Sequence, residues 1–210
     1  MYIPKSFAIT NAETLYAFMR AHNFATLVTH HDGHMTATSL PFMVDSERGI
    51  LQAHLARAND QWKHFDGSES LVIFQGAHAY ISPTWYGDHP SVPTWNYTAV
   101  HVYGIPQVIE DDTTIRAMLG ELVHNHEGGR SPEWQMSLPE DYMQKMMKAI
   151  VVFEIPMERV EGKFKMSQNR SESDQASVAA NLAASSDPLD QQTSDLMRSL
   201  QKAESPTPIS

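Results

Sequence analysis

The spacing of apolar positions changes near the start of the chain. Leu15, Phe18 and Met19 recur at helical spacing behind a Thr-x-x-Glu capping box that begins at Thr10, which predicts an amphipathic helix over 11–22. Apolar and polar residues then alternate with a period of two, and Asp-Gly and Glu-Arg-Gly sequences supply turns. A meander of antiparallel strands is therefore expected over 24–30, 34–45 and 49–55.

The middle of the chain combines short helices with longer strands. Asn59 is expected to cap a helix that ends near Phe65. This order of elements is typical of an antiparallel barrel or sandwich, so the expected fold class is mainly β with peripheral helices. Further strands are expected over 70–76 and 77–82 (one strand bent near Gly76), over 94–109 (bent at 104–106) and, as the final strand, over 149–155, with helices from Asp111 or Asp112 to Asn125 and from Pro139 to Lys148.

The 210 residues fit one domain with an appendage. From about Ser171 the composition shifts to Ser, Ala, Gln and Asp. We therefore divide the chain into a domain over 1–175 and a C-terminal tail over 176–210 that is helical or partly disordered. In this region helices are expected over 174–184 and 195–202, and the last residues are expected to be loose.

Charge and composition exclude several classes of protein. The formal net charge is −10, and there is no basic run or helix-turn-helix pattern, so nucleic acid is not an obvious partner. The absence of cysteine excludes disulfides, a thiolate nucleophile and cysteine-ligated metal sites. The first residues lack the apolar core of a signal peptide, and no apolar run approaches about 20 residues, which predicts a soluble, cytoplasmic protein.

The segment HLARANDQWK (54–63) carries a strand into the N-terminus of a helix. Free backbone N–H groups and the positive end of the helix dipole favour an anion there, and the planar guanidinium of Arg57 suits a phosphate. The alternative is an ordinary capped helix with Arg57 and Lys63 on its surface. The residues alone leave both interpretations open.

A second polar segment, KFKMSQNRSESD (163–174), gathers cations in a chain that is short of them. Lys163, Lys165 and Arg170 flank Ser167-Gln-Asn, whose amides both donate and accept hydrogen bonds. Such a set suits an oxidised heterocycle or a phosphate. The alternative, a polar connector, is slightly favoured by the residues alone.

Large aromatic residues surround a proline-rich loop over 81–104, where two of the four tryptophans, Trp85 and Trp95, lie. Alternation along a strand would place Trp95 and Tyr97 on one face and Asn96 on the other. Such rings suit a planar ligand or a subunit interface, although packing at a barrel end is the more frequent fate.

Eleven histidines raise the question of a metal site. Neither the group His30, His31 and His34 nor the pair His124 and His126 has a secure ligand geometry, because residues two apart do not share a helix face. We interpret them as solvated surface residues, so no metal is expected. The motifs of serine hydrolases, P-loop proteins and Rossmann folds are absent, and no catalytic residue can be assigned.

Five segments in order resemble the FMN-binding negative transcriptional regulators of the PaiB type: MYIPKSF, HLARANDQWK, VIFQGAHAYISPTWY, VPTWNYTAVHVYG and KFKMSQNR. The resemblance covers about residues 1–175. It implies an FMN-binding split barrel, an antiparallel and Greek-key-like β-barrel, that forms homodimers with flavin at the subunit interface. The implied cofactor-binding residues are Thr38, Ser39, Leu40, His54, Leu55, Arg57, Asn59, Trp95, Asn96, Tyr97, Lys165, Gln168, Asn169 and Arg170, with Arg57 as the main phosphate ligand.

The resemblance implies a regulator of gene expression, but the acidic charge speaks against direct contact with DNA, so a protein partner or the redox state of the flavin is an alternative route. A flavin-dependent oxidoreductase acting on a small molecule is a second hypothesis, since fold alone does not give function. A haem-binding or haem-degrading protein, with His89 or His101 on the iron, is a third. A dimer with an empty pocket is the fourth.

Overall fold

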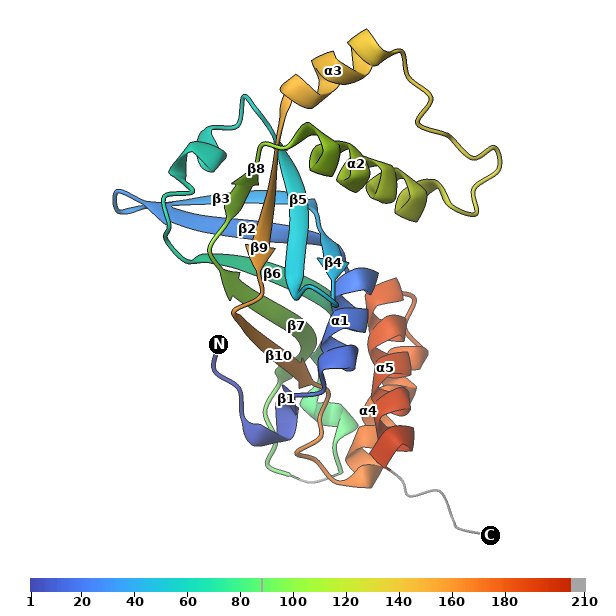
Figure 1. The fold of residues 1–210 in the computed structure, drawn as a ribbon. Coiled ribbons are helices and arrows are strands. Elements are labelled where there is room, and N and C mark those ends of the chain that lie inside the picture. Colours follow the sequence, from blue (N-terminus) through green and yellow to red (C-terminus); the bar gives the residue numbers. More distant parts are fainter. Residues whose placement is uncertain (88, 205–210) are drawn as a thin grey trace. The chain divides into compact units, whose positions relative to one another are not determined.

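The computed structural model describes residues 1–87 and 89–204 (Figure 1). The chain forms two compact units, and their boundaries fall inside α1 (Ala12–Ala21), β6 (Ser70–Ile81), β7 (Thr94–Gly104) and β10 (Arg159–Lys165). Over the described ranges, no helix has the length and apolar character needed to cross a membrane. Unit 1 comprises Met1–Leu15, Gln75–Val100 and the described part of Glu161–Ser210, and unit 2 comprises Tyr16–Phe74 and His101–Val160.

Most of the regular structure is antiparallel sheet with helices around it, so the expected fold class is confirmed. The other strands are β1 (Ala8–Ile9), β2 (Phe24–His31), β3 (His34–Pro41), β4 (Met43–Asp45), β5 (Ile50–Ala56), β8 (Gln107–Ile109) and β9 (Ile150–Pro156). The other helices are α2 (Asp112–Glu127), α3 (Glu140–Lys148), α4 (Glu172–Ala183) and α5 (Pro188–Glu204), with short 3-10 turns η1 (Lys5–Phe7), η2 (Asp60–His64) and η3 (Pro83–Trp85).

Unit 2 contains two antiparallel sheets. In one, the order is β6, β2 and β3, with Thr26 of β2 opposite Ile73 on one side and Ser39 on the other. In the other, the order is β4, β5, β9 and β8. Phe42 joins β3 to β4 as the chain changes sheet, and its buried ring packs against Phe74 and Phe153. The single long strand expected over 34–45 is therefore two strands in two sheets.

Unit 1 contains the strand order β1, β10, β7 and β6 together with α4 and α5. The two helices lie side by side (Figure 1). They bury an apolar cluster against the sheet because both helices present apolar residues on one side. The cluster consists of Ala79, Ile81, Tyr86, Met166, Val178, Ala179, Leu182 and Met197.

The final strand was predicted wrongly. The apolar strand expected over 149–155 is present as β9, but β10 follows it and pairs with β1. With Lys163 and Lys165 in it, the sequence of β10 is typical of a polar connector. Gly162 weakens the apolar pattern of a strand further. The strand forms because Gly162 leaves room for Leu15 and Ile9, contacts that the local sequence does not reveal.

The C-terminal region is helical, as expected, and both helices are longer than predicted: α4 begins at Glu172 and α5 begins at Pro188. Ser171 caps α4, since its hydroxyl accepts a hydrogen bond from the backbone N–H of Asp174. The loose end that the sequence predicts falls on 205–210, outside the described residues. The division of the chain into a domain and a tail stays a prediction.

Candidate functional site

In unit 2, the loop after β5 contacts β3 through polar residues that were predicted to bind the cofactor. Asn59 caps η2 by accepting a hydrogen bond from the backbone N–H of Gln61, and its Nδ2 donates to Oγ1 of Thr38 at 3.1 Å. Ser39, next along β3, is exposed, and its hydroxyl lies 3.3 Å from that of Thr26 on β2. These contacts join the two unit 2 segments, 38–40 and 54–59, that the resemblance assigns to one cofactor site.

Gln61 belongs to this polar group but was missed by sequence reasoning. Its side chain is buried, and Nε2 donates to the Thr29 hydroxyl, to the Thr36 carbonyl and, at longer range, to the Leu27 carbonyl. Its Oε1 has no hydrogen-bond partner among the described residues. Gln61 lies within HLARANDQWK, but glutamine is usually exposed, so its type gave no signal.

The remaining unit 2 candidates around β5 differ in accessibility. Leu40 and Leu55 are buried in the core, so their side chains have a packing role. His54 is half-buried and lies opposite Val152 in the β5–β9 ladder. Burial lowers the pKa of its imidazole, which favours the neutral ring.

Arg57 has its guanidinium directed at the backbone where α3 ends. Its Nε donates to the carbonyl of Lys148 at 2.7 Å, and an Nη donates to the carbonyl of Ile150 at 2.7 Å. The carbonyls at the C-terminus of a helix lack intrahelical partners, and a cation satisfies them well. In this structure Arg57 therefore fastens the loop after β5 to the junction of α3 and β9.

Replacing Arg57 with lysine should lower the free energy of unfolding by about 1 kcal/mol, because a lysine cannot reproduce two divergent N–H donors from one planar group. Urea denaturation followed by circular dichroism would measure the change. Lys63→Met is the matched control, since Lys63 is an exposed cation paired with Asp60. Equal midpoints for wild type and Arg57→Lys would show that the two carbonyl contacts contribute nothing.

In unit 1, exposed aromatic side chains of β6 and β7 lie next to one another. Trp95 is 54% exposed and Tyr80 is 47% exposed. The Trp95 ring lies 5.9 Å from the Tyr80 ring and 6.3 Å from the His78 ring, centroid to centroid. His78 and Tyr80 were not selected from the sequence, although their alternation on the strand was a signal. Large exposed aromatic rings in contact with one another are typical of a surface that binds a ligand or another protein.

The basic strand β10 borders this aromatic surface. Nζ of Lys165 donates to the Trp95 carbonyl at 2.5 Å and to the Thr94 hydroxyl at 2.8 Å. Nζ of Lys163 lies 5.1 Å from the centroid of the Tyr97 ring. The structure thus brings Trp95, Tyr97, Lys163 and Lys165 together on neighbouring strands, and their role in binding a cofactor stays a prediction. We call His78, Tyr80, Trp95, Tyr97, Lys163 and Lys165 the basic aromatic face.

Asn96 lies on the opposite face of β7, as the strand alternation predicted. It is fully buried, and its Nδ2 donates to the Ser167 hydroxyl at 2.9 Å and lies 3.6 Å from the sulfur of Met197. Asn96 therefore holds the turn after β10 and α5 in place behind the exposed rings.

The three other candidates after β10 have different surroundings. The side-chain amide of Gln168 binds the backbone of the turn: it accepts a hydrogen bond from the backbone N–H of Met166 and donates one to the Phe164 carbonyl. Asn169 is exposed. Arg170 is half-buried, with its guanidinium carbon 4.2 Å from the centroid of the Tyr86 ring. Of the three, only Arg170 presents a charge that a ligand can use.

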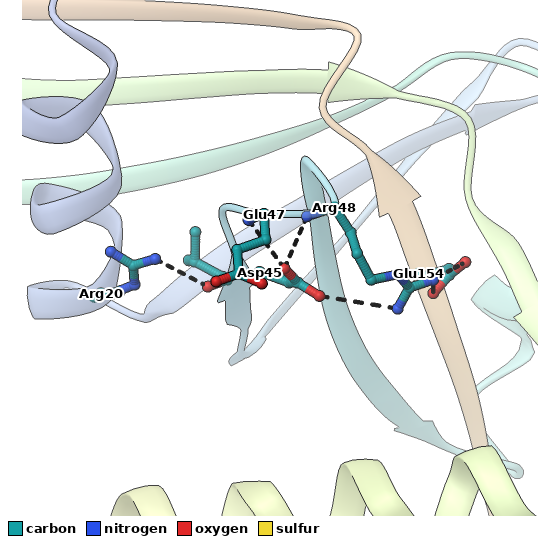
Figure 2. A network of polar contacts seen from close by, with 6 residues as sticks. Arg20, Asp45, Glu47, Arg48 and Glu154 are labelled. Carbon is teal, nitrogen blue, oxygen red and sulfur yellow. Dashed lines mark hydrogen bonds and ion pairs between the residues drawn. The ribbon is translucent and has the colours of Figure 1, made fainter.

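A cavity of about 700 Å³ lies in unit 2, and none of the candidate residues is among those that line it. Several of its polar groups already bind one another (Figure 2). Arg20 donates to the Ser46 hydroxyl at 2.6 Å, and the Asp45 carboxylate accepts from the backbone N–H groups of Glu47 and Arg48. Arg48, which is not among the lining residues, pairs with Glu154. This cavity therefore presents fewer available donors than its polar lining suggests.

The chain is similar to known proteins over most of its length. "Protease synthase and sporulation protein PAI 2" from Bacillus subtilis (strain 168) is 38% identical over 200 residues, which cover 94% of this chain and 96% of the relative. The flavocytochrome Anf3 from Azotobacter vinelandii superposes with a TM-score of 0.64 at 16% identity, covering 83% of this chain and 78% of that one. A FAD and heme binding protein from Mycobacterium smegmatis gives a TM-score of 0.61 at 19% identity, covering 80% and 78%.

At these identities the solved structures show the fold alone, and the fold is the split barrel that the sequence resemblance implied. The family described as "Putative FMN-binding domain" matches residues 1–159, which include the candidates from Thr38 to Tyr97 and end before β10 is complete. FMN, the predicted cofactor, is the ligand that this description names. The chain belongs to this FMN-binding family and resembles its PaiB-type member in Bacillus subtilis.

Proposed function

We propose that this protein binds FMN as a homodimer, with flavin at the subunit interface, and that it acts in the cytoplasm as a regulator of gene expression. The observation that carries the proposal is the basic aromatic face of unit 1, in a chain that belongs to an FMN-binding family. The isoalloxazine ring is flat and largely apolar, and FMN ends in a phosphate. A flavin site therefore needs flat walls and a few placed polar or charged groups.

The rings of the basic aromatic face supply such walls. Trp95 and Tyr80 together expose a surface that costs free energy while it faces water. A bound flavin ring, or a partner subunit laid over that ring, would remove this surface from water. The neighbouring lysines supply the charge that the phosphate end needs.

A second exposed surface, in unit 2, supports the homodimer. Within the described part of the chain, β3 has β2 as its only strand neighbour, and most of its side chains are exposed, including Met35 at 66%. Phe24, at the start of β2, is 69% exposed. Long edge strands with exposed apolar residues are normally covered, since they otherwise invite aggregation. A second copy of the chain would cover this one.

The regulatory part of the proposal rests on the Bacillus subtilis relative, whose name refers to protease synthesis and sporulation. With a net charge of −10, this chain is a poor direct ligand for DNA phosphates. We therefore place regulation at the level of a protein partner that responds to the flavin-bound dimer.

Titration of the flavin-free protein with FMN, followed by flavin fluorescence, would test the proposal together with light scattering for the molar mass. We expect one FMN bound per chain and a molar mass twice that of the chain. A retained chromophore with a Soret band instead of flavin bands would favour the haem hypothesis. A monomer that binds no flavin would contradict the proposal.

A further inference from the structure

The cavity of unit 2 has the size of a small-molecule site and no role in the proposed flavin function. Its volume of about 700 Å³ lies within the range of about 300–1,000 Å³ that is usual for ligand pockets. Phe42, Met43 and Val44 contribute apolar side chains to its lining. Polar residues from the C-terminal halves of α1 and α2 and from the turn after β4 complete it. The lining therefore suits a ligand with an apolar body and a few polar groups.

The lining has few hydrogen-bond donors left for a ligand. Of the described residues that line the cavity, only Arg20 carries a permanent positive charge, and it lies beside the turn that carries Asp45 and Glu47 (Figure 2). Its guanidinium donates to the Ser46 hydroxyl at 2.6 Å and, at 3.5 Å, to the Val44 carbonyl. The backbone N–H of Glu47 donates to the Asp45 carboxylate. These donors already bind acceptors of the cavity wall.

Acceptors and negative charge predominate in the lining. The carboxylates of Asp45, Glu47 and Glu121 face the single guanidinium of Arg20. The ion pairs within residues 1–87 and 89–204 include neither Glu47 nor Glu121. Arg20 and His126 lie in the last turns of α1 and α2, so two helix dipoles add their negative ends. A hollow lined mainly by one sign of charge concentrates the field inside it, so this cavity attracts cations.

An organic cation suits the lining better than a metal ion does. Over the described ranges, no group of three His, Cys, Asp or Glu residues is placed to hold a metal. Asp45 also uses its carboxylate to accept hydrogen bonds from two backbone N–H groups. A planar amidinium or guanidinium spreads its charge over several N–H donors and matches the geometry of a carboxylate.

We infer that this cavity binds a small organic cation, an amidinium, a guanidinium or a protonated amine, whose apolar body lies against Phe42 and Met43 and whose N–H groups donate to Glu47 and Glu121. The inference does not depend on the flavin function, because the cavity lining contains neither the segments 38–40 and 54–59 nor the basic aromatic face. FMN carries the opposite charge, so the same field disfavours it.

The first test uses three small molecules of nearly the same shape: benzamidine is a cation, benzamide is neutral and benzoate is an anion. Calorimetric titration of the full chain should show binding of benzamidine, binding of benzamide that is at least about tenfold weaker, and no binding of benzoate. Higher salt should weaken benzamidine binding, because salt screens exposed charges. Benzamide that binds as tightly as benzamidine, or no binding of benzamidine up to about 10 mM, would overturn the inference.

Variants of the lining locate the cation and predict changes of opposite sign. Glu47→Gln and Glu121→Gln should each weaken benzamidine binding by about twofold to fivefold, and the double variant should weaken it further. Arg20→Gln should strengthen it by about twofold, because this change removes a like charge from the same wall. Glu133→Gln is the matched control, since Glu133 is an exposed glutamate of unit 2 outside the lining, and it should leave the affinity unchanged.

Titration of the same variants with FMN separates this inference from the flavin function. The affinity for FMN should be the same in the wild type and in the double glutamate variant. A benzamidine affinity that is unchanged in the double variant would place the cation elsewhere on this acidic chain and overturn the inference, with the flavin function left standing. A wild type that binds no FMN but binds benzamidine through the two glutamates would refute the flavin function and support the cation site.

Discussion

Replacing Trp95 with alanine should weaken FMN binding by about tenfold to a hundredfold, since stacking of a flat ring on an aromatic side chain contributes about 1–3 kcal/mol. The same change should alter the free energy of unfolding by less than about 1 kcal/mol, because the indole is 54% exposed and its ring neighbours are His78, in a tilted arrangement, and Tyr80, in a T-shaped one. If the dimer closes over the flavin, the variant should also dimerise more weakly.

Trp134→Ala is the matched control for this experiment, because Trp134 is 47% exposed and belongs to unit 2, outside the proposed site. Flavin titration and light scattering on both variants would separate loss of a ligand contact from loss of exposed tryptophan in general. An unchanged affinity for FMN and an unchanged molar mass in Trp95→Ala would show that the flavin lies elsewhere.

A Gly104→Ala variant should lose about 3 kcal/mol of stability or fail to fold. A Cβ at Gly104 would lie 2.0 Å from the carbonyl oxygen of Pro156 and 2.8 Å from a side-chain carbon of Ile155. The first of these atoms belongs to the backbone of β9, so relief requires the strands to separate and not only a side chain to rotate. A shift of the backbone at residue 104 would also disturb the hydrogen bond that the Ser70 hydroxyl donates to its carbonyl at 2.9 Å.

Gly120→Ala supplies the control, since a Cβ there meets only the end of the Met136 side chain at 3.7 Å and alanine is the better helix former within α2. Urea denaturation should place Gly104→Ala well below the wild type and Gly120→Ala at or slightly above it. A Gly104→Ala midpoint equal to that of the wild type would mean that β7 and β9 do not approach as closely as described.

Strand alternation was the part of the candidate site that the sequence predicted well. The period of two placed Trp95 and Tyr97 on one face of β7 and Asn96 on the other, and the structure confirms this. Alternation of side chains is a local property of the strand backbone, so it can be predicted without knowing which strands pair with it. Two of the predicted caps are confirmed for the same reason, at Asn59 and Asp111. The cap predicted at Thr10 was wrong by one residue, because α1 begins at Ala12 and the backbone N–H of Thr14 donates to the side chain of Asn11.

The contacts of Arg57 and Lys163 were not predictable, because their partners lie far away in the sequence. Arg57 meets carbonyls that follow it by about ninety residues. Lys163 became a buried strand residue through Tyr2, Tyr97 and the pairing of β10 with β1. A lysine beside a glycine is typical of a solvated connector. The sequence therefore predicted neither the strand β10 nor the burial of Lys163.

A crystal structure of the protein loaded with FMN would test the central claim most directly, because it locates both ends of the cofactor. The account predicts the isoalloxazine ring against Trp95, with a second copy of the chain closing the site. A flavin that makes no contact with Trp95, or one that occupies the cavity beside Arg20 and Asp45, would contradict it.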